Sequence, residues 1–443
     1  MRGDADEKRR KICRADCVSM LGTIGHRHAA RIDSDTFVGQ GKVLSTLKPT
    51  VLVVTTARWF PTARLAVALT NAGCSVQAVC PSGSPITSTT ILKGKFSFRG
   101  LAPLKSITAA IAGAKPDLLV SGDDLATWHL HCLYNSAFNT GEATRELIVR
   151  SLGSPEYFPI VDDRASFMHA AHEIGVRVPR TAVISDSKDF QASQLGFPAI
   201  LKANGTSGGD GVRVVRSEQE ARAALRYLQA PPLLARAMKR AIFDQDTTLL
   251  RPSLQRRRSA VNAQSFIAGR EATSATACWQ GSVLAATHFE VLQKGHFAGH
   301  ATVVRRIDHP EMASAVEKMA RRLQLSGLHG FDFMLEDVSR DAYLIEINPR
   351  ATQVGHLSFG AGRDLPGALA SALLARAADA APNVTENDVI ALFPQEWLRD
   401  PASPYLRSGY HDVPWNQPGL LRSAFEKSDR SGSNLFRRLL RKS

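Results

Sequence analysis

The chain has 443 residues, of which 44% are hydrophobic and 22% are charged. This composition is typical of a globular protein with two to four structural units, and it excludes collagen, a coiled-coil rod and wholesale disorder. The 55 Lys and Arg residues exceed the 41 Asp and Glu residues and give a formal net charge of +14. Because the basic residues are spread out, a protein that handles a small anion explains them as well as one that binds nucleic acid or anionic lipid.

The chain shows no targeting or membrane signal. No run of 18 apolar residues occurs, so no transmembrane helix is expected. The first twenty residues lack the apolar core of a secretory signal and carry several acids. The six cysteines are scattered without a C-x2-C pair, which argues against a zinc site and a disulfide framework. We therefore expect a reducing, cytoplasmic setting.

The N-terminal third predicts a parallel sheet. Residues 1–48 are polar and are expected to form a partly disordered extension. Apolar runs and helical patterns then alternate, and the order β-α-β-α-β implies a Rossmann-like unit at 49–160. The predicted strands are 50–56, 75–80 and 117–121, and the predicted helices are 61–73 and 104–113. No G-x-G-x-x-G follows the first strand, so no dinucleotide is assigned to this unit.

The rest of the chain predicts mixed structure. Asp163 is a good N-cap for a helix at 164–174. Two segments are basic, namely an arginine-rich loop at 239–260 and an amphipathic helix candidate at 434–442. The other predicted helices are 217–228 and 310–324, and the predicted strands are 197–203, 212–215, 261–267, 271–279, 282–291, the hairpin 328–348 and 389–393.

A lysine-bearing strand runs into a glycine-rich loop at residues 200–212. Lys202 ends the apolar strand, and four glycines follow within nine residues. Glycines let backbone N–H groups approach one anion, and the lysine adds a positive charge. The loop is not a Walker A motif, because no Gly-Lys-Ser/Thr ends it. A phosphate site and a plain glycine-rich turn beside a lysine both fit these residues.

Two alternating strands at 327–335 and 342–348 predict a metal site. If their hairpin is symmetric, Asp332 lies opposite Glu346, and Asn348 lies on the same face. Opposed carboxylates repel unless a cation lies between them or one is protonated. Two carboxylates and an amide oxygen suit Mg²⁺ or Mn²⁺, and Arg350 would offer a fork to a phosphate or carboxylate. The alternative is a solvated polar face.

A third segment, residues 263–271, is a strand, a glycine and a second strand. Its backbone could bond the edge of an adenine ring, and Glu271 could accept ribose hydroxyls. By itself the segment is better explained as an ordinary hairpin.

In this order, the three segments resemble the ATP-grasp superfamily, and the sequence LIEINPR at 344–350 after GFDFML carries the resemblance. The resemblance covers about residues 50–375. It implies an α/β and α+β protein, in which a Rossmann-like parallel-sheet domain at 49–160 precedes a two-subdomain ATP-grasp fold at 161–380. The small subdomain would span about 161–262 and the large one about 263–380, and residues 381–443 would form a C-terminal extension with a basic tail.

The resemblance also implies site roles. Lys202 and Arg164 would contact the phosphates of ATP, Glu271 the ribose, and Arg350 with Lys202 would stabilise the transferred phosphoryl group. Asp332, Glu346 and Asn348 would bind Mg²⁺ or Mn²⁺. The remaining residues would hold ATP through the glycine loop and the hinge strand; they are Gly205, Ser207, Gly208, Gly209, Gly211, Gln264, Ser265, Phe266 and Ile267. The chain departs from the family pattern at Gln264, often Glu, and at Gly330, an arginine in some ligases.

The function implied is an ATP- and Mg²⁺-dependent ligase that joins a small-molecule carboxylate to an amine or other nucleophile through an acyl phosphate. Two alternatives stay open: an enzyme that forms carboxyphosphate, similar to carbamoyl-phosphate synthase or biotin carboxylase, and a non-catalytic ATP-binding protein. Nucleic-acid binding is not expected, because the basic clusters lack interleaved aromatic residues. The sequence leaves a homo-oligomer open.

Overall fold

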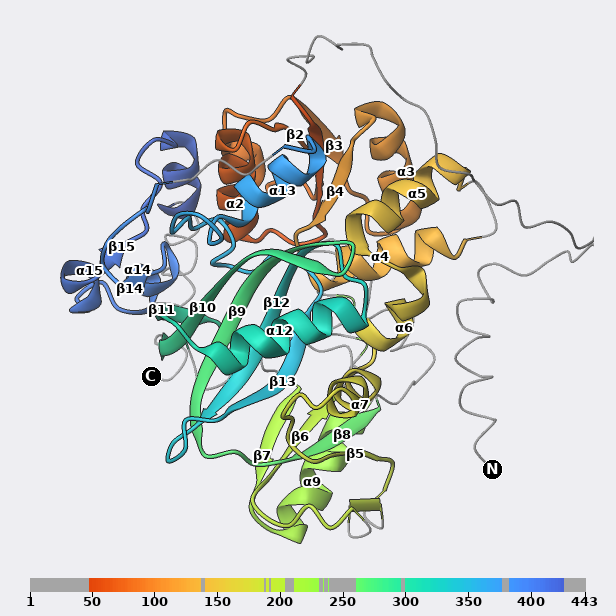
Figure 1. Ribbon diagram of the computed structural model, residues 1–443, viewed down its shortest axis with the longest axis vertical. Coiled ribbons are helices and arrows are strands. Elements are labelled where there is room, and N and C mark those ends of the chain that lie inside the picture. The colour runs from red at the N-terminus through yellow and green to blue at the C-terminus, as the bar shows by residue number, and fades with distance from the viewer. Residues whose placement is uncertain are drawn as a thin grey trace, which may run out of the picture.

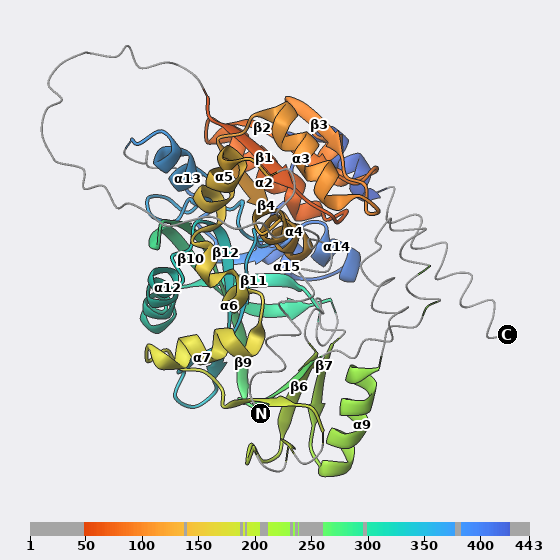
Figure 2. The same cartoon turned by 90° about the vertical axis from the view of Figure 1, so that its right-hand side faces the viewer.

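The computed structural model describes residues 48–136, 140–186, 189–190, 193–203, 211–230, 234, 238, 260–295, 299–376 and 382–425. Three sheets organise these residues (Figure 1). Figures 1 and 2 show a parallel sheet at one end, a small antiparallel sheet at the other end and a large sheet between them. The predicted α/β and α+β architecture is confirmed.

The first sheet is parallel, as the alternating pattern predicts, and its strand order is β3-β2-β1-β4, which includes a strand, β3, that was not predicted. Its strands are β1 (Thr50–Val54), β2 (Ser75–Cys80), β3 (Gly94–Ser97) and β4 (Leu118–Ser121), and its main helices are α2 (Phe60–Asn71), α3 (Pro103–Ala114), α4 (Asp124–Tyr134) and α5 (Glu142–Leu152). Strand β1 is buried on both faces, because Val51 and Val53 pack against α2 while Leu52 and Val54 pack against the helices of the other side.

The small sheet is antiparallel and carries the lysine-bearing strand. Its order is β5-β8-β6-β7, with strands β5 (Thr181–Ile184), β6 (Ala199–Ala203), β7 (Val212–Val215) and β8 (Val261–Ser265). Helix α9 (Glu218–Gln229) buries Leu225 and Leu228 against these strands. Helix α7 (Arg164–Glu173) begins after Asp163, whose side chain accepts from the N–H of Ser166 as an N-cap. Short helical turns at Pro155–Tyr157 and α6 (Phe158–Val161) lead into it.

The large sheet has seven strands in the order β13-β12-β9-β10-β11-β14-β15. Their bounds are β9 (Gly269–Trp279), β10 (Ser282–Lys294), β11 (Ala301–Ile307), β12 (Gly327–Glu336), β13 (Ala342–Asn348), β14 (Val389–Ala391) and β15 (Tyr410–His411). Helix α12 (Pro310–Arg322) covers one face, where Met312 and Met319 meet Phe331 and Phe333. Helix α13 (Leu365–Leu373) covers the other face.

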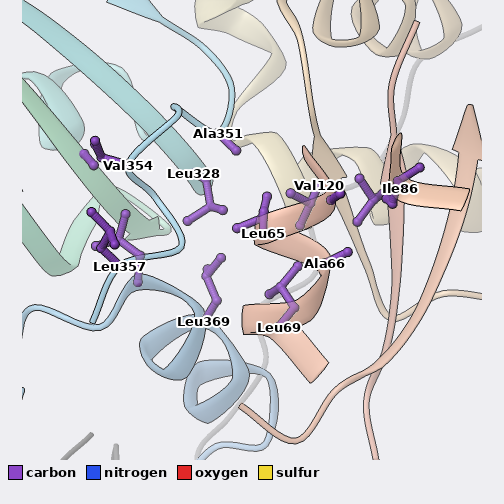
Figure 3. Packing of buried hydrophobic residues seen from close by; sticks show 14 of the residues in the cluster. Leu65, Ala66, Leu69, Ile86, Val120, Leu328, Ala351, Val354, Leu357 and Leu369 are labelled. Atoms are coloured by element: carbon purple, nitrogen blue, oxygen red, sulfur yellow. The ribbon is translucent and has the colours of Figure 1, made fainter. Parts of the chain in front are cut away.

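The parallel-sheet unit and the large sheet share one hydrophobic core. Leu65 and Leu69 of α2 lie beside Leu369 of α13 and Leu328 of β12 (Figure 3). These four side chains are at most 6% exposed. The two units are therefore packed together without an intervening solvent layer at this face.

The C-terminal segment extends the large sheet. Strand β14, part of the predicted strand at 389–393, pairs with β11, and the expected irregular stretch after it contains α14 (Gln395–Arg399), α15 (Tyr405–Ser408) and β15. The buried carboxylate of Asp412 accepts hydrogen bonds from Arg64 of α2 and, at 2.7 Å, from Nε2 of His356.

The basic helix candidate at 434–442 and residues 239–259 lie outside the described residues. Within the described ranges, no helix combines the length and apolar character that crossing a membrane requires.

Candidate functional site

The two predicted carboxylates face each other on neighbouring strands. Strands β12 and β13 are antiparallel, and Asp332 pairs with Glu346 while Gly330 pairs with Asn348, so the predicted register is confirmed here. Beyond this point the symmetric register is wrong, because a β-bulge shifts the pairing by one residue and Phe333 pairs with Leu344. The bulge turns Leu344 fully into the core while it leaves the carboxylate pair in place.

Asp332 accepts two hydrogen bonds from neutral donors. Thr273 of β9 donates through Oγ1 and Asn348 through Nδ2, both at 2.8 Å. Burial, together with the negative charge of Glu346, raises the pKa of Asp332 to about 6. The carboxyl group is therefore partly protonated near neutral pH unless a cation joins it.

Glu346 is surrounded by positive charge. Arg164, the first residue of α7, donates from one terminal nitrogen to Oε1 of Glu346 and from the other to the carbonyl oxygen of Ala203, the latter at 3.0 Å. Burial opposes ionisation of Glu346, but Arg164 and Lys202 outweigh it and hold the pKa of this carboxyl below its usual range. The two facing acids thus differ, with Glu346 ionised and Asp332 poised to lose its proton.

Lys202 of β6 brings the small sheet to the same place. Its side chain is 5% exposed. Burial lowers the pKa of Lys202 to about 8, and the charges of Glu346 and Asp332 oppose this shift. The structure therefore gathers Lys202, Arg164 and the two acids between the small and the large sheet.

Arg350 is fixed by four neighbours. Its Nε donates to Oδ1 of Asp124 at 3.1 Å, Nη2 donates to Oδ1 of Asn348 at 3.1 Å, and Nη1 donates to the carbonyl oxygen of Ala351 at 3.2 Å. The guanidinium lies 5.0 Å from the ring centroid of Trp59. Asn348 thus links Asp332 to Arg350. No sequence pattern predicted the contact with Trp59.

The neighbouring acid Asp123 fills the anion-binding position of the parallel sheet. Its carboxylate accepts from the hydroxyl of Thr55, from both the N–H and the hydroxyl of Thr56, from the N–H of Ala57 and from the N–H of Ala126, at 2.6–3.2 Å. The donors at the end of β1 and the start of α4 are therefore used internally. This agrees with the absence of a dinucleotide motif after β1.

The predicted hinge lies at the end of β8. Gln264 is 1% exposed. Ser265 and Arg180 exchange hydrogen bonds, because the N–H of Ser265 donates to the carbonyl oxygen of Arg180 at 2.9 Å and its Oγ accepts at 3.1 Å. Phe266 is exposed and Ile267 is half-buried between the two sheets. Glu271 accepts from Nζ of Lys294 at 2.6 Å.

Most of the glycine-rich loop lies outside the described residues, including Gly205, Ser207, Gly208 and Gly209. Gly211 is described and buried, and its carbonyl oxygen accepts from the N–H of Ala203 at 2.9 Å. This bond closes the β6–β7 hairpin directly after Lys202.

The oxygen atoms present suit a hard divalent cation. Over the described ranges, no cluster of three or more His, Cys, Asp and Glu side chains forms a metal site, so a cation here would rely on Asp332, Glu346 and Asn348. Oδ1 of Asn348 already accepts from Arg350, and its second lone pair remains for a metal. The raised pKa of Asp332 means that its ionised form is poorly stabilised by the neighbouring protein groups, and a bound cation would stabilise it. This agrees with a cation site formed by Asp332, Glu346 and Asn348.

Residues 163–358 match the family model described as "Carbamoyl-phosphate synthase L chain, ATP binding domain". The carbamoyl phosphate synthase large chain of Vibrio cholerae is 25% identical over 217 residues, which are 45% of this chain and 17% of that protein. The biotin carboxylase of Haemophilus influenzae is 27% identical over 203 residues, which are 44% of this chain and 42% of that protein. The matched stretch therefore spans less than half the length of these relatives.

Solved structures show the same fold. A biotin carboxylase from Campylobacter jejuni superposes with a TM-score of 0.54 at 15% identity and covers 76% of this chain and 73% of its own. An N5-carboxyaminoimidazole synthase from Aspergillus clavatus superposes with a TM-score of 0.53 at 14% identity and covers 74% of this chain and 78% of its own. Both superpositions extend well beyond residues 163–358.

Proposed function

We propose that this chain is an enzyme of the ATP-grasp superfamily, namely an ATP- and Mg²⁺-dependent ligase that joins a small-molecule carboxylate to an amine. The observation that carries the proposal is the pairing of Asp332 with Glu346 on the large sheet, opposite Lys202 of the small sheet. The acids that would hold a cation lie close enough to the buried ammonium of Lys202, which would meet phosphate oxygens, for their charges to interact. A nucleoside triphosphate with a divalent cation needs both.

The proposed chemistry has two steps. An oxygen of the substrate carboxylate attacks the γ-phosphorus of ATP, the bond to the β-phosphate oxygen breaks, and ADP leaves. The amine nitrogen then attacks the acyl carbon, inorganic phosphate leaves, and the nitrogen loses a proton. Such transfer depends on positioning and charge neutralisation and needs no protein nucleophile.

The residues have distinct proposed roles. Lys202 and Arg164 bind the phosphate oxygens, and Arg350 stabilises the transferred phosphoryl group. Asp332, Glu346 and Asn348 would hold Mg²⁺, or Mn²⁺ in its place, and the ion would supply charge neutralisation at the phosphates. The hinge and loop residues implied by the family resemblance, from Gly205 to Glu271, would hold the rest of the nucleotide.

A second candidate function is carboxyphosphate formation from bicarbonate. The match of residues 163–358 to the carbamoyl-phosphate synthase ATP-binding family favours it. The same residues would act, because the difference lies in which carboxylate attacks ATP. The proposed setting is the cytoplasm, which fits the free thiols of Cys74, Cys80 and Cys278 in the described chain.

A phosphate-release screen tests the proposal. The full chain is incubated with ATP and Mg²⁺ and with bicarbonate alone, with single carboxylates, or with carboxylate–amine pairs. Release that requires a pair supports the ligase, and release with bicarbonate alone supports the second candidate. ATP binding without release under all conditions would refute both and leave a nucleotide-binding protein.

Two variants connect the activity to the site. Lys202→Ala and Glu346→Ala are each expected to lower turnover at least ~10²-fold, the scale of one lost electrostatic group. The matched controls are Lys318→Ala and Glu317→Ala, which change exposed residues on α12 and should leave turnover unchanged. Near-normal turnover of either site variant would count against the assignment.

A further inference from the structure

We propose that Asp124 of the parallel-sheet unit is a positioning residue that orients Arg350, so that this unit completes the catalytic site. The inference rests on the proposed function and adds a residue that neither the sequence resemblance nor the family match assigns. Asp124 lies 226 positions before Arg350 in the chain, and the two meet because α4 begins beside the end of β13.

The contacts on Arg350 restrict the direction of its guanidinium. Asp124 occupies Nε, Asn348 occupies one hydrogen of Nη2, and Ala351 occupies one hydrogen of Nη1. A guanidinium has five N–H donors in a fixed plane, so within the described part of the chain one hydrogen on each terminal nitrogen remains for an anion. Of these three partners, only Asp124 carries a charge.

The parallel-sheet unit forms a hydrogen bond with each of the three consecutive residues 349–351. The hydroxyl of Thr127 donates to the carbonyl oxygen of Pro349 at 2.6 Å, Asp124 accepts from Arg350, and the carbonyl oxygen of Ser121 accepts from the N–H of Ala351 at 3.1 Å. Strand β4 and the first turn of α4 thus form a template along residues 349–351. A template of this kind specifies orientation more strongly than one ion pair does.

Asp124 is itself held in place. It is the first residue of α4, and the N-cap before it, Asp123, is bonded to the loop that follows β1. The side chain of Asp124 remains 44% exposed, whereas that of Arg350 is 12% exposed. The carboxylate therefore approaches Arg350 from the solvent side and can keep it turned toward the carboxylate pair through Asn348.

Kinetic measurements on a double-mutant cycle test this role. Asp124→Asn, Arg350→Lys and the double variant are assayed for phosphate release with the substrate pair found for the wild type. We expect Asp124→Asn to lower kcat about 10- to 100-fold with KM for ATP within about twofold, the scale of a misoriented group. In the Arg350→Lys background, the same change should alter kcat less than about twofold.

Two further variants serve as controls. Asp308→Asn breaks the exposed pair with Arg363, in which Asp308 is 78% exposed, and should leave kcat unchanged. Asp124→Glu keeps the charge and should recover part of kcat. If Asp124→Asn melts below the assay temperature, Asp124→Glu in both backgrounds gives the same comparison.

Each outcome is decisive. A kcat of Asp124→Asn within twofold of the wild type would overturn the inference while the ligase proposal stands. A loss that persists in the Arg350→Lys background would mean that Asp124 contacts substrate directly, and it would also overturn the positioning role. If the wild type releases no phosphate with any substrate, the proposed function fails, and the inference fails with it.

Discussion

Asp332 and Glu346 lie opposite each other on β12 and β13, yet they have different electrostatic surroundings. Glu346 is bonded to Arg164 and faces Lys202, which hold its pKa below the usual range against the effect of burial. Within the described residues, the carboxylate of Asp332 accepts from the neutral side chains of Thr273 and Asn348, and its pKa is raised to about 6. A divalent cation would bind most favourably once Asp332 has lost its proton.

We therefore predict that Mn²⁺ binding weakens as the pH falls below about 6. Each unit below this value should lower the affinity roughly tenfold, because the ion must displace one proton. Electron paramagnetic resonance of free Mn²⁺ between pH 5 and 8 measures this directly. Asp332→Asn, which cannot ionise, should bind weakly with no such dependence, and a flat affinity in the wild type would contradict the prediction.

The stability of the metal-free protein should show the opposite trend. The folded pKa of Asp332, about 6, lies above the unfolded value near 3.8, so the folded state binds more protons between these values. This contribution to stability is complete below about pH 4 and is lost as the pH rises through 6. Urea unfolding of the wild type and Asp332→Asn across this range isolates the effect, because the Asn variant lacks it.

Replacing Lys202 by Met should stabilise the protein and abolish ATP binding. The folded pKa of Lys202, about 8, is lower than the ordinary value of 10.5, so at pH 7 the buried charge opposes folding. Removing it should raise the free energy of unfolding by about 1 to 3 kcal/mol. Urea unfolding gives the stability, and calorimetric titration with ATP and Mg²⁺ gives the binding.

The pH dependence of stability tests whether the buried charge of Lys202 is the cause of the stabilisation. Because the folded pKa of Lys202 is lowered, the wild type should gain stability as the pH rises from about 8 towards 10.5, while Lys202→Met should not. Lys318→Met on exposed α12 is the control and should change neither stability nor ATP binding. A destabilised Lys202→Met would mean that the ammonium group favours folding, contrary to the prediction.

Much of the fold was predictable, because each sheet contains strands with a clear apolar pattern. The buried run at 50–54 and the alternating strands of the 327–348 hairpin are examples. The sequence did not reveal β3, which has one aromatic residue in the four positions Gly94–Ser97 and pairs along one edge only. It also did not reveal that β14 joins the large sheet, because three residues carry no information about their partner strand.

The part of the candidate site that lies within one hairpin was predictable from the sequence. The pairing of Asp332 with Glu346 follows from the hairpin alone, but the bulge after it does not, since nothing in the alternation marks the extra residue. The adjacent acids Asp123 and Asp124 are not distinguished by their local sequence. In the structure Asp123 caps α4 and Asp124 faces Arg350, a division that depends on contacts between distant segments.

Asp123→Ala should destabilise the protein far more than loss of an ordinary N-cap. The carboxylate accepts from Thr55, Thr56 and Ala57 in addition to the N–H of Ala126, so its removal leaves several donors unpaired. We expect a loss of about 3 to 5 kcal/mol by urea unfolding.

Asp364 provides the comparison for this prediction. It caps α13 through the N–H of Gly367 at 3.2 Å, so Asp364→Ala should cost only about 1 kcal/mol. Equal losses in the two variants would show that the additional bonds of Asp123 add no stability.

Gly330 allows the chain after Arg350 to pack against β12. A Cβ atom at this position would lie 2.2 Å from Cγ2 of Thr352 and 3.4 Å from Cβ of Asn348. This contact explains why a larger side chain does not fit at position 330 in this structure. Gly330→Ala should displace Thr352 and, with it, the segment that carries Arg350, so turnover should fall about tenfold or more.

A second substitution distinguishes the steric cause from a general loss of stability. Thr352→Ser removes Cγ2 and keeps the hydroxyl group, so Gly330→Ala combined with Thr352→Ser should recover most of the phosphate-release activity. Thr352→Ser alone should stay within about threefold of the wild type, because it deletes one methyl group. If the double variant is as inactive as Gly330→Ala, the methyl group of Thr352 is not what excludes a side chain at position 330, and the side chain of Asn348 is the remaining close contact.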